Sequence, residues 1–448
     1  MLSWKGINRQ PNSLHIQPKK RSERGKMQGF LHCVLASLFL STVWTRPQLA
    51  DHDDHQHHLH HGEDEPHPVH GKGEKACHRL APHNANFAFA LYKQMAARVE
   101  AESKNVFFSP LGIATTLSLL AIGSKGDTHQ QLFQALGYNQ LTTAQVNEAY
   151  EHLQHMLAHS QEELKLDKGS AVVLQDGFKP LQKFLDDAKH YYQAQGFTVD
   201  FKKPEEAVQA INKFIAEKTD NKISDLLSSV QSDTLMVLLN YIYFRGKWEK
   251  PFDVKNTGKA DFKVDENTTV SVDMMKRLGR YSYYYDRENH TSVLMLPYKG
   301  NASMMILLPC EGKMKDLEAI LSKEYIKHWQ DNLYRIVVDL EMPKFSVSGS
   351  YSLKEYLREM GVVSVFSDAA DLSGISEDVG LKLSKVSHKA VLSVDEKGTE
   401  AAAATAAEMI PMSLPDTVSL NRPFLLLILE ESTQSILFMG KIVNPTAQ

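Results

Sequence analysis

The chain is poor in cysteine, and its first fifty residues contain no apolar run long enough to cross a bilayer. The longest such run, residues 30–44, is shorter than the about 20 residues that a membrane-spanning helix needs. It begins just after Lys26 and Met27, a pattern typical of a signal peptide, here residues 27–50. Residues 1–26 then form an upstream extension. We therefore expect a secreted, extracellular protein with no membrane partner; a membrane anchor is the alternative that the shortness of the run disfavours.

Cysteine is scarce in the mature part of the chain as well. Of the three cysteines, Cys33 leaves with the signal peptide, so Cys77 and Cys310 remain. Secretion permits a disulfide bond between them, but the sequence does not show one. A domain of this size does not need such a bond for stability, which favours free or mixed-disulfide thiols.

Excess positive charge is also missing. Without residues 1–50 the chain has 42 basic and 53 acidic residues, a net charge of -11. This balance argues against a nucleic-acid partner. Residues 139–163 contain no Lys or Arg, and no basic cluster elsewhere indicates a heparin site.

Sequence motifs of common enzymes are absent. There is no G-x-S-x-G, no H-E-x-x-H, no P-loop and no C-x-x-C. Catalytic residues can be far apart in sequence, so a hydrolase stays a minor alternative. We expect no enzymatic activity and no cofactor.

Residues 51–83 have almost no large apolar side chain but hold ten of the twenty histidines. Such a segment cannot form a core, so we predict a disordered, acidic, His-rich tail. Its imidazoles could bind Zn²⁺ or Cu²⁺ weakly, although a tail without a metal role is at least as good an interpretation. The histidines concerned are His52, His55, His57, His58, His60 and His61.

The remaining residues, 84–448, predict one α+β domain with large mixed β-sheets and about eight or nine helices. Phe87, Leu91, Met95 and Val99 recur every four residues, which indicates a helix that starts near residue 86. Further helical patterns follow, and strand-rich stretches dominate after about residue 234. Helices first and strands later are typical of α+β domains.

The stretch DEKGTEAAAATAAEMIPMSLP, residues 395–415, fits no ordinary element. Its Ala and Glu residues favour a helix. It nevertheless continues the β-type run VLSVD directly, and it has no apolar stripe with which a helix could pack.

These residues resemble the hinge of an inhibitory serpin, a family of serine protease inhibitors. The supporting motifs are NVFFSP (105–110), NYIYFRGKW (240–248), SKVSHKAVL (384–392) and FMGKIVNP (438–445). They occur in serpin order from about residue 84 to the end. The resemblance implies a serpin-like single domain, most simply a monomer, with an exposed reactive-centre loop.

In that family the loop acts as a suicide substrate. Insertion of the serpin loop into a β-sheet is a known example of a conformational switch by strand addition. The resemblance implies that a serine protease attacks the carbonyl of Met412, leaves Ser413 as a new amino end, and stays covalently bound while loop 398–412 inserts into the main sheet. An unbranched Met412 indicates elastase-like or chymotrypsin-like targets. The alternative is a non-inhibitory serpin that carries a ligand.

Loop insertion requires small side chains wherever the strand faces the core. The odd-numbered positions from 399 to 407 are all Thr or Ala and so have small side chains. Glu400 and Glu408 stand at even-numbered positions, which would face the other side of the strand. Gly398 supplies the backbone freedom that the chain needs to turn back before the inserted strand. The predicted hinge residues are Glu396, Gly398, Thr399, Ala401, Ala403 and Thr405.

Other roles follow from the resemblance alone. Ser109, Asn240 and His388 match the family's polar cluster beneath the point where the main sheet opens, and Trp248 matches the aromatic residue where insertion starts. Position 112 is often serine in the family, but here it is Gly112. The missing hydroxyl and the weaker helix suggest that the sheet opens more readily.

Three N-glycosylation sequons agree with secretion. Their acceptors are Asn267, Asn289 and Asn301.

Overall fold

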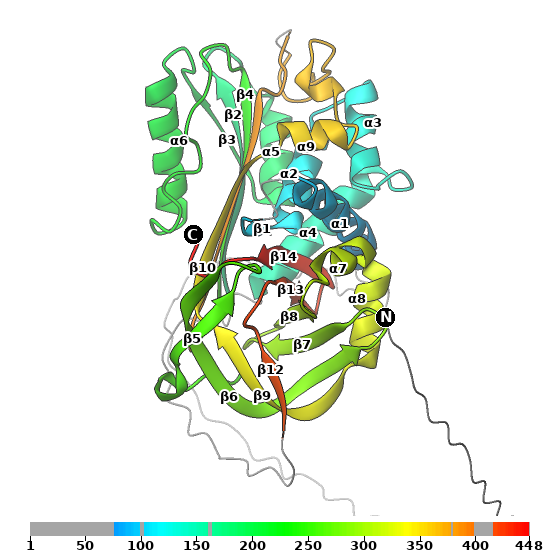
Figure 1. Cartoon of the computed structure of the whole chain (residues 1–448). Coiled ribbons are helices and arrows are strands. Elements are labelled where there is room, and N and C mark those ends of the chain that lie inside the picture. The colour runs from blue at the N-terminus through cyan, green and yellow to red at the C-terminus, as the bar shows by residue number, and fades with distance from the viewer. Residues whose placement is uncertain (1–75, 99–102, 160–163, 378–379, 398–414, 448) are drawn as a thin grey trace, which may run out of the picture. The chain divides into compact units, whose positions relative to one another are not determined.

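The computed structural model describes residues 76–98, 103–159, 164–377, 380–397 and 415–447 (Figure 1). The chain divides into two units, Met1–Val69 and His70–Gln448, and the described residues all belong to the second. The signal peptide, the upstream extension and the six tail histidines lie outside the described residues. Within the described part, no helix combines the length and the apolarity needed to cross a membrane.

Helices dominate the first part of this unit, as predicted. Ser109 caps α2 by accepting a hydrogen bond from the backbone N–H of Gly112, and Pro110 occupies the first helical position. The predicted stripe of α1 is confirmed at Phe87, Leu91 and Met95, which are all buried. The α-helices of the described residues are α1 (Ala81–Ala96), α2 (Pro110–Ile122), α3 (Gly126–Ala135), α4 (Thr143–His159), α5 (Gln182–Tyr192), α6 (Pro204–Lys218), α7 (Met314–Ile320), α8 (Lys323–Asn332) and α9 (Lys354–Glu359).

The folded unit starts earlier than the sequence indicated. Residues 76–83, assigned above to the disordered tail, contain a 3-10 helix, Ala76–Arg79, and the first residues of α1. Cys77 and Leu80 are each only 1% exposed and belong to the main core. The boundary at residue 83 is therefore wrong, because these two apolar side chains anchor a segment that is otherwise mostly polar.

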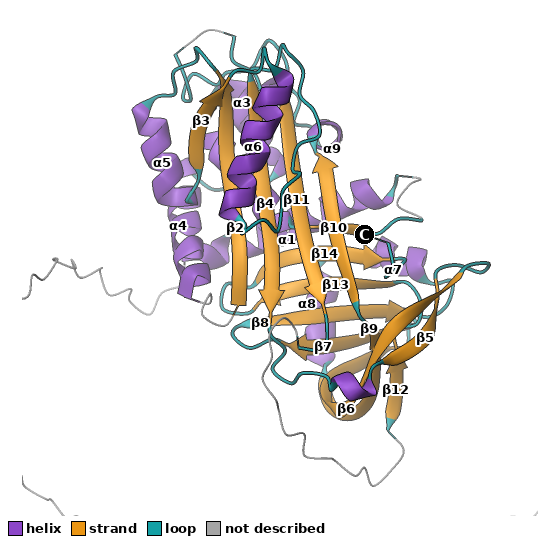
Figure 2. Cartoon of the chain, turned by 90° about the vertical axis from the view of Figure 1, so that its left-hand side faces the viewer, coloured by secondary structure: helices purple, strands orange, loops and turns teal. Residues whose placement is uncertain are grey.

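Five strands form the sheet that contains the strand directly before residues 395–415. Their order is β10-β11-β4-β2-β3, and β11 runs parallel to β4 but antiparallel to β10. Helix α6 lies across one face (Figure 2), and α2 packs beneath the other. The strands are β2 (Leu164–Gln175), β3 (Gln195–Val199), β4 (Met236–Gly246), β10 (Phe345–Ser352) and β11 (Lys385–Val394).

A second sheet has nine strands in the order β1-β14-β13-β8-β7-β6-β9-β12, with β5 paired to β6. Every residue of β13 and β14 is buried. The strands are β1 (Val106–Phe108), β5 (Gly258–Lys263), β6 (Thr269–Asp286), β7 (Thr291–Pro297), β8 (Ala302–Pro309), β9 (Tyr334–Pro343), β12 (Asp416–Ser419), β13 (Phe424–Glu430) and β14 (Ser435–Ile442). Both sheets mix parallel and antiparallel pairs, which confirms the predicted α+β class with large mixed sheets.

Candidate functional site

Residues 398–414, which we call the reactive segment, connect the two sheets. On its amino side β11 ends at Val394 and is followed by the described residues 395–397. On its carboxyl side Pro415 leads into β12, which pairs in parallel with β9 of the nine-stranded sheet. Seven of the predicted site residues belong to the segment and so lie outside the described residues. They are Gly398, Thr399, Ala401, Ala403, Thr405, Met412 and Ser413.

Glu396, the first predicted hinge residue, is held firmly although its side chain is a carboxylate. It is 5% exposed, and its carboxylate accepts hydrogen bonds from Thr257 Oγ1 at 2.9 Å and from Lys344 Nζ at 3.1 Å. Its backbone oxygen accepts from the N–H of Phe252 at 2.8 Å. Burial alone would raise the pKa of Glu396, but these hydrogen bonds and the Lys344 charge outweigh it and lower the pKa.

Trp248 covers the same end of β11. Its ring stacks on Tyr298 with centroids 4.3 Å apart, and Phe252 meets it edge-on. The indole N–H donates to the backbone oxygen of Asp395 at 2.9 Å, so the polar atom of this buried ring is satisfied. The predicted aromatic lid therefore contacts the chain directly before Glu396, where a strand inserted after β11 would begin.

The predicted polar cluster, Ser109, Asn240 and His388, is brought together in the middle of the five-stranded sheet. The backbone N–H of Ser109 donates to His388 Nε2 at 3.0 Å, and Ser109 Oγ donates to the Leu437 oxygen of β14 at 2.7 Å. His388 Nδ1 lies 2.8 Å from Asn240 Oδ1. Because Nε2 accepts a hydrogen bond from the backbone N–H of Ser109, the ring hydrogen must be on Nδ1 and donate to Asn240. The cluster thus ties β11 to β4 and to the start of α2.

His388 and Asn240 also face each other in the strand register. They are direct partners in the parallel pairing of β11 with β4. His388 is fully buried, and burial lowers its pKa to about 3, so the ring is neutral at physiological pH. A strand placed between β11 and β4 would have to break this contact.

Asn240 extends the cluster to β2. Its Nδ2 donates to the Gly169 oxygen at 3.2 Å and to Ser170 Oγ at 3.3 Å. Its amide also occupies the space beside Gly112, where an added Cβ would lie 2.5 Å from Asn240 Oδ1. The space that a Cβ at position 112 would need is therefore taken by the Asn240 amide.

Sequence reasoning missed the partners of these residues. Lys344 and Thr257 hold Glu396, and Ser170 extends the cluster, but none of them stands in a recognisable motif. Lys344 lies between two strands, β9 and β10, where a polar residue is unremarkable in sequence. Only the fold brings it to Glu396.

The sequon asparagines differ in their surroundings. Asn267 and Asn301 are exposed. Asn289 is half-buried, its amide donates to Asp286 Oδ2 at 2.7 Å, and Thr291 of the same sequon is fully buried. The turn therefore already uses the nitrogen that a glycan would modify at Asn289.

The described residues show no cluster of His, Cys, Asp and Glu that could hold a metal ion. No disulfide bond joins Cys77 to Cys310 in that part of the chain; Cys77 is buried and Cys310 is half-buried. The histidine tail predicted as a weak metal ligand stays a prediction.

A family model described as "Serpin (serine protease inhibitor)" matches residues 82–445. The chain belongs to the serpin family. An alpha-1-antitrypsin homolog from Cyprinus carpio is 59% identical over 322 residues, which are 72% of this chain and 87% of that protein. Alpha-1-antiproteinase 2 from Equus caballus is 44% identical over 375 residues, 83% of this chain and 89% of that protein.

Solved structures of similar proteins agree with this assignment. Human thyroxine-binding globulin complexed with thyroxine has 40% sequence identity and a TM-score of 0.78, with 83% of this chain and all of that chain covered. Human glycosylated kallistatin has 41% identity and a TM-score of 0.78, with 84% of this chain covered. This serpin thus has the predicted single-domain fold and resembles alpha-1-antitrypsin in sequence, and serine proteases are its expected partners.

Proposed function

We propose that the protein is a secreted suicide inhibitor of elastase-like or chymotrypsin-like serine proteases. The protease cleaves Met412–Ser413 and becomes trapped as an acyl-enzyme when residues 398–412 insert between β11 and β4. The inhibitor supplies a substrate and stored folding energy but no catalytic residue, and it acts as a monomer without a cofactor.

The observation that carries this proposal is the parallel pairing of β11 with β4, directly upstream of the reactive segment. Residues 385–392 pair with residues 237–244. A chain that turns back after Lys397 would run antiparallel to both strands. Insertion would then replace one parallel ladder with two antiparallel ladders, which are more stable per residue. The exchange supplies a driving force that only a free, cleaved strand can use.

The composition of the segment suits this movement. Positions 399, 401, 403, 405 and 407 are Thr or Ala and would face the core, whereas Glu400 and Glu408 would face solvent. From Gly398 to Met412 the strand would measure roughly 46 Å. A compact domain of this size is on the order of 50 Å across, so the tethered protease would be carried from one pole to the other.

Met412 determines the proposed target. Its unbranched apolar side chain fits a medium-sized hydrophobic specificity pocket, whereas a pocket with a buried acid would require Lys or Arg. Cleavage at Ala407 or Met409 is the competing possibility within the same segment.

Secretion is supported by the signal-like residues 27–50 and by two sequons with exposed acceptors, Asn267 and Asn301. We propose these two as the principal glycosylation sites. Asn289 is the weaker candidate because its amide is engaged in a turn.

The test mixes the uncleaved full chain with an elastase-like protease and follows a denaturing gel. We expect a detergent-stable complex and a released carboxyl-terminal fragment. The mass and the amino-terminal sequence of this fragment should show that it begins at Ser413. A fragment with another amino end would contradict the assignment of the cleaved bond, and clipping without a complex would contradict inhibition.

A pair of charge substitutions tests insertion itself. Thr399→Arg places a guanidinium where the inserted strand faces the core, and burial of an unpaired charge costs several kcal/mol. We expect clipping without complex formation. Glu400→Arg is the matched control, because its side chain would face solvent and inhibition should persist. Equal inhibition by the two variants would refute the proposed parity.

The second candidate function is ligand transport, which the similarity to thyroxine-binding globulin complexed with thyroxine favours. A carrier that does not inhibit would be clipped by proteases and would gain no thermal stability from cleavage. The small residues at the hinge argue for inhibition instead.

A further inference from the structure

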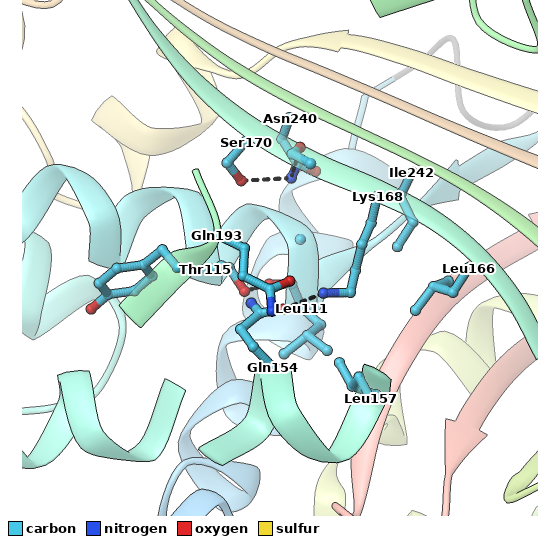
Figure 3. Close-up of a pocket in the computed structure, with 13 residues that line it drawn as sticks. Leu111, Thr115, Gln154, Leu157, Leu166, Lys168, Ser170, Gln193, Asn240 and Ile242 are labelled. Atoms are coloured by element: carbon cyan, nitrogen blue, oxygen red, sulfur yellow. Dashed lines mark hydrogen bonds between the residues drawn. The ribbon is translucent and has the colours of Figure 1, made fainter. Parts of the chain in front are cut away.

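A cavity of about 60 Å³ lies behind the five-stranded sheet. Its walls come from α2, α4, the end of α5 and the strands β2 and β4 (Figure 3). The volume offers room for roughly four to six water-sized groups. Asn240 and Ser170 of the polar cluster lie in its wall, but no step of the proposed inhibitory mechanism fills the cavity.

Lys168 of β2 gives the cavity its charge. Its side chain reaches across the cavity and donates a hydrogen bond to Gln154 Oε1 of α4 (Figure 3). Burial lowers the pKa of Lys168 to about 8, so the side chain is mostly protonated at neutral pH. Among the described residues that line the cavity there is no Asp or Glu, so the other described lining groups are uncharged.

The rest of the lining has two characters. The amides of Gln154 and Gln193 and the hydroxyl of Ser170 provide hydrogen-bonding groups. Apolar walls are provided by Leu111, Leu157, Leu166 and Ile242. An occupant should therefore have one negatively charged end and a short apolar end.

We propose that this cavity binds a small organic carboxylate of about four to six non-hydrogen atoms. The carboxylate would accept charge-assisted hydrogen bonds from the Lys168 ammonium, and its alkyl end would contact the leucines. A cation would be repelled by Lys168. A neutral apolar molecule would leave the half-buried ammonium without a counter-charge, which is unfavourable.

The proposed binding depends on pH through Lys168. Among the described lining residues the titratable side chains are Lys168 and Tyr192, and α2, α4 and β4 contribute uncharged residues. Burial raises the pKa of Tyr192 well above its usual value, and its hydroxyl donates to Asn147 Oδ1 at 2.7 Å. Loss of the Lys168 proton should therefore weaken binding about tenfold between pH 7 and pH 9.

The experiment is calorimetric titration of the uncleaved full chain at pH 7 with butyrate, n-butanol and butylamine. We expect butyrate to bind at least about tenfold more tightly than either analogue. Equal binding of butyrate and n-butanol would overturn the proposal, as would no heat with butyrate. Undiminished butyrate binding at pH 9 would overturn the role of Lys168.

Two variants localise the site. Lys168→Met keeps the length of the side chain but removes the charge, and it should reduce butyrate affinity at least about tenfold. Lys213→Met, at an exposed position of α6, is the control and should bind like the wild type. Equal affinity of both variants would place the site elsewhere. If Lys168→Met does not fold, the comparison of butyrate with n-butanol on the wild type still decides the proposal, and displacement of butyrate by chloride at equal concentration would show a general anion site instead.

Discussion

Gly112→Ala should destabilise this serpin, although the same substitution normally stabilises a helix. Position 112 lies in the first turn of α2, where Ala is favoured over Gly by up to about 1 kcal/mol. The added Cβ, however, would lie 2.5 Å from Asn240 Oδ1 and 3.1 Å from Asn240 Nδ2. Since this first turn of α2 is itself buried and packs against the sheet, the Asn240 amide has to move.

The cost follows from what Asn240 holds. Its displacement breaks the 2.8 Å contact with His388 and the hydrogen bonds to Gly169 and Ser170. A buried group left without a partner costs about 1–3 kcal/mol. With two or more groups affected, the loss exceeds the helix gain, and we expect a net destabilisation of about 2 kcal/mol.

The assay is urea unfolding of the uncleaved chain in a double-mutant cycle with Asn240→Ala. In that background the obstructing amide is gone, so Gly112→Ala should become neutral or stabilising by up to about 1 kcal/mol. The substitution thus changes sign with its background. Stabilisation of equal size in both backgrounds would refute the steric argument and restore the view that Gly112 merely weakens the helix.

Three further predictions concern the specificity, the pH response and the hinge. Met412→Arg should redirect inhibition from elastase-like to trypsin-like proteases, measured as association rates with both; unchanged preference would contradict Met412 as the determinant. In the folded state His388 stays neutral down to about pH 3, whereas in the unfolded chain it takes up a proton below about pH 6.5. The free energy of unfolding should therefore decrease as the pH falls from about 6.5 to about 3, with a loss of about 2 kcal/mol at pH 5. In urea unfolding at several pH values, His388→Gln should not show this pH-dependent loss of stability. Parallel pH profiles of the wild type and the variant would exclude His388 as its cause. Lys344→Met should leave the buried carboxylate of Glu396 with one partner fewer and lower stability by about 1–3 kcal/mol in the same assay, whereas Lys344→Arg should retain most of it.

Local signals in the sequence were sufficient for several parts of the structure. The Ser109-Pro110 cap, the stripe of α1 and the strand that leads to the hinge all depend on neighbouring residues, and the structure confirms them. The approach of Ser109, Asn240 and His388 was predictable only through the family resemblance, since these residues are far apart in the chain.

The remainder depends on packing that no local pattern encodes. Lys344 and Glu396 are 52 positions apart and meet only because β10 and β11 pair. Lys168 of β2 meets Gln154 of α4 only because the fold places α4 beside this strand. Cys77 and Leu80 become core residues because the folded helices offer them a surface, although their polar neighbours suggested a tail.

The position of β13 and β14 affects how the chain can be made. These strands come from the last 25 residues, yet they lie between β1 and β8, and β14 pairs with β1 from the start of the fold. At about 5–20 residues per second, a ribosome needs tens of seconds to travel from β1 to β13. Until β13 and β14 emerge, β1 and one edge of β8 lack their partners in this sheet, and unpaired apolar strands favour aggregation. A premature stop codon that removes only β14 would therefore yield an aggregating polypeptide, not a shortened inhibitor.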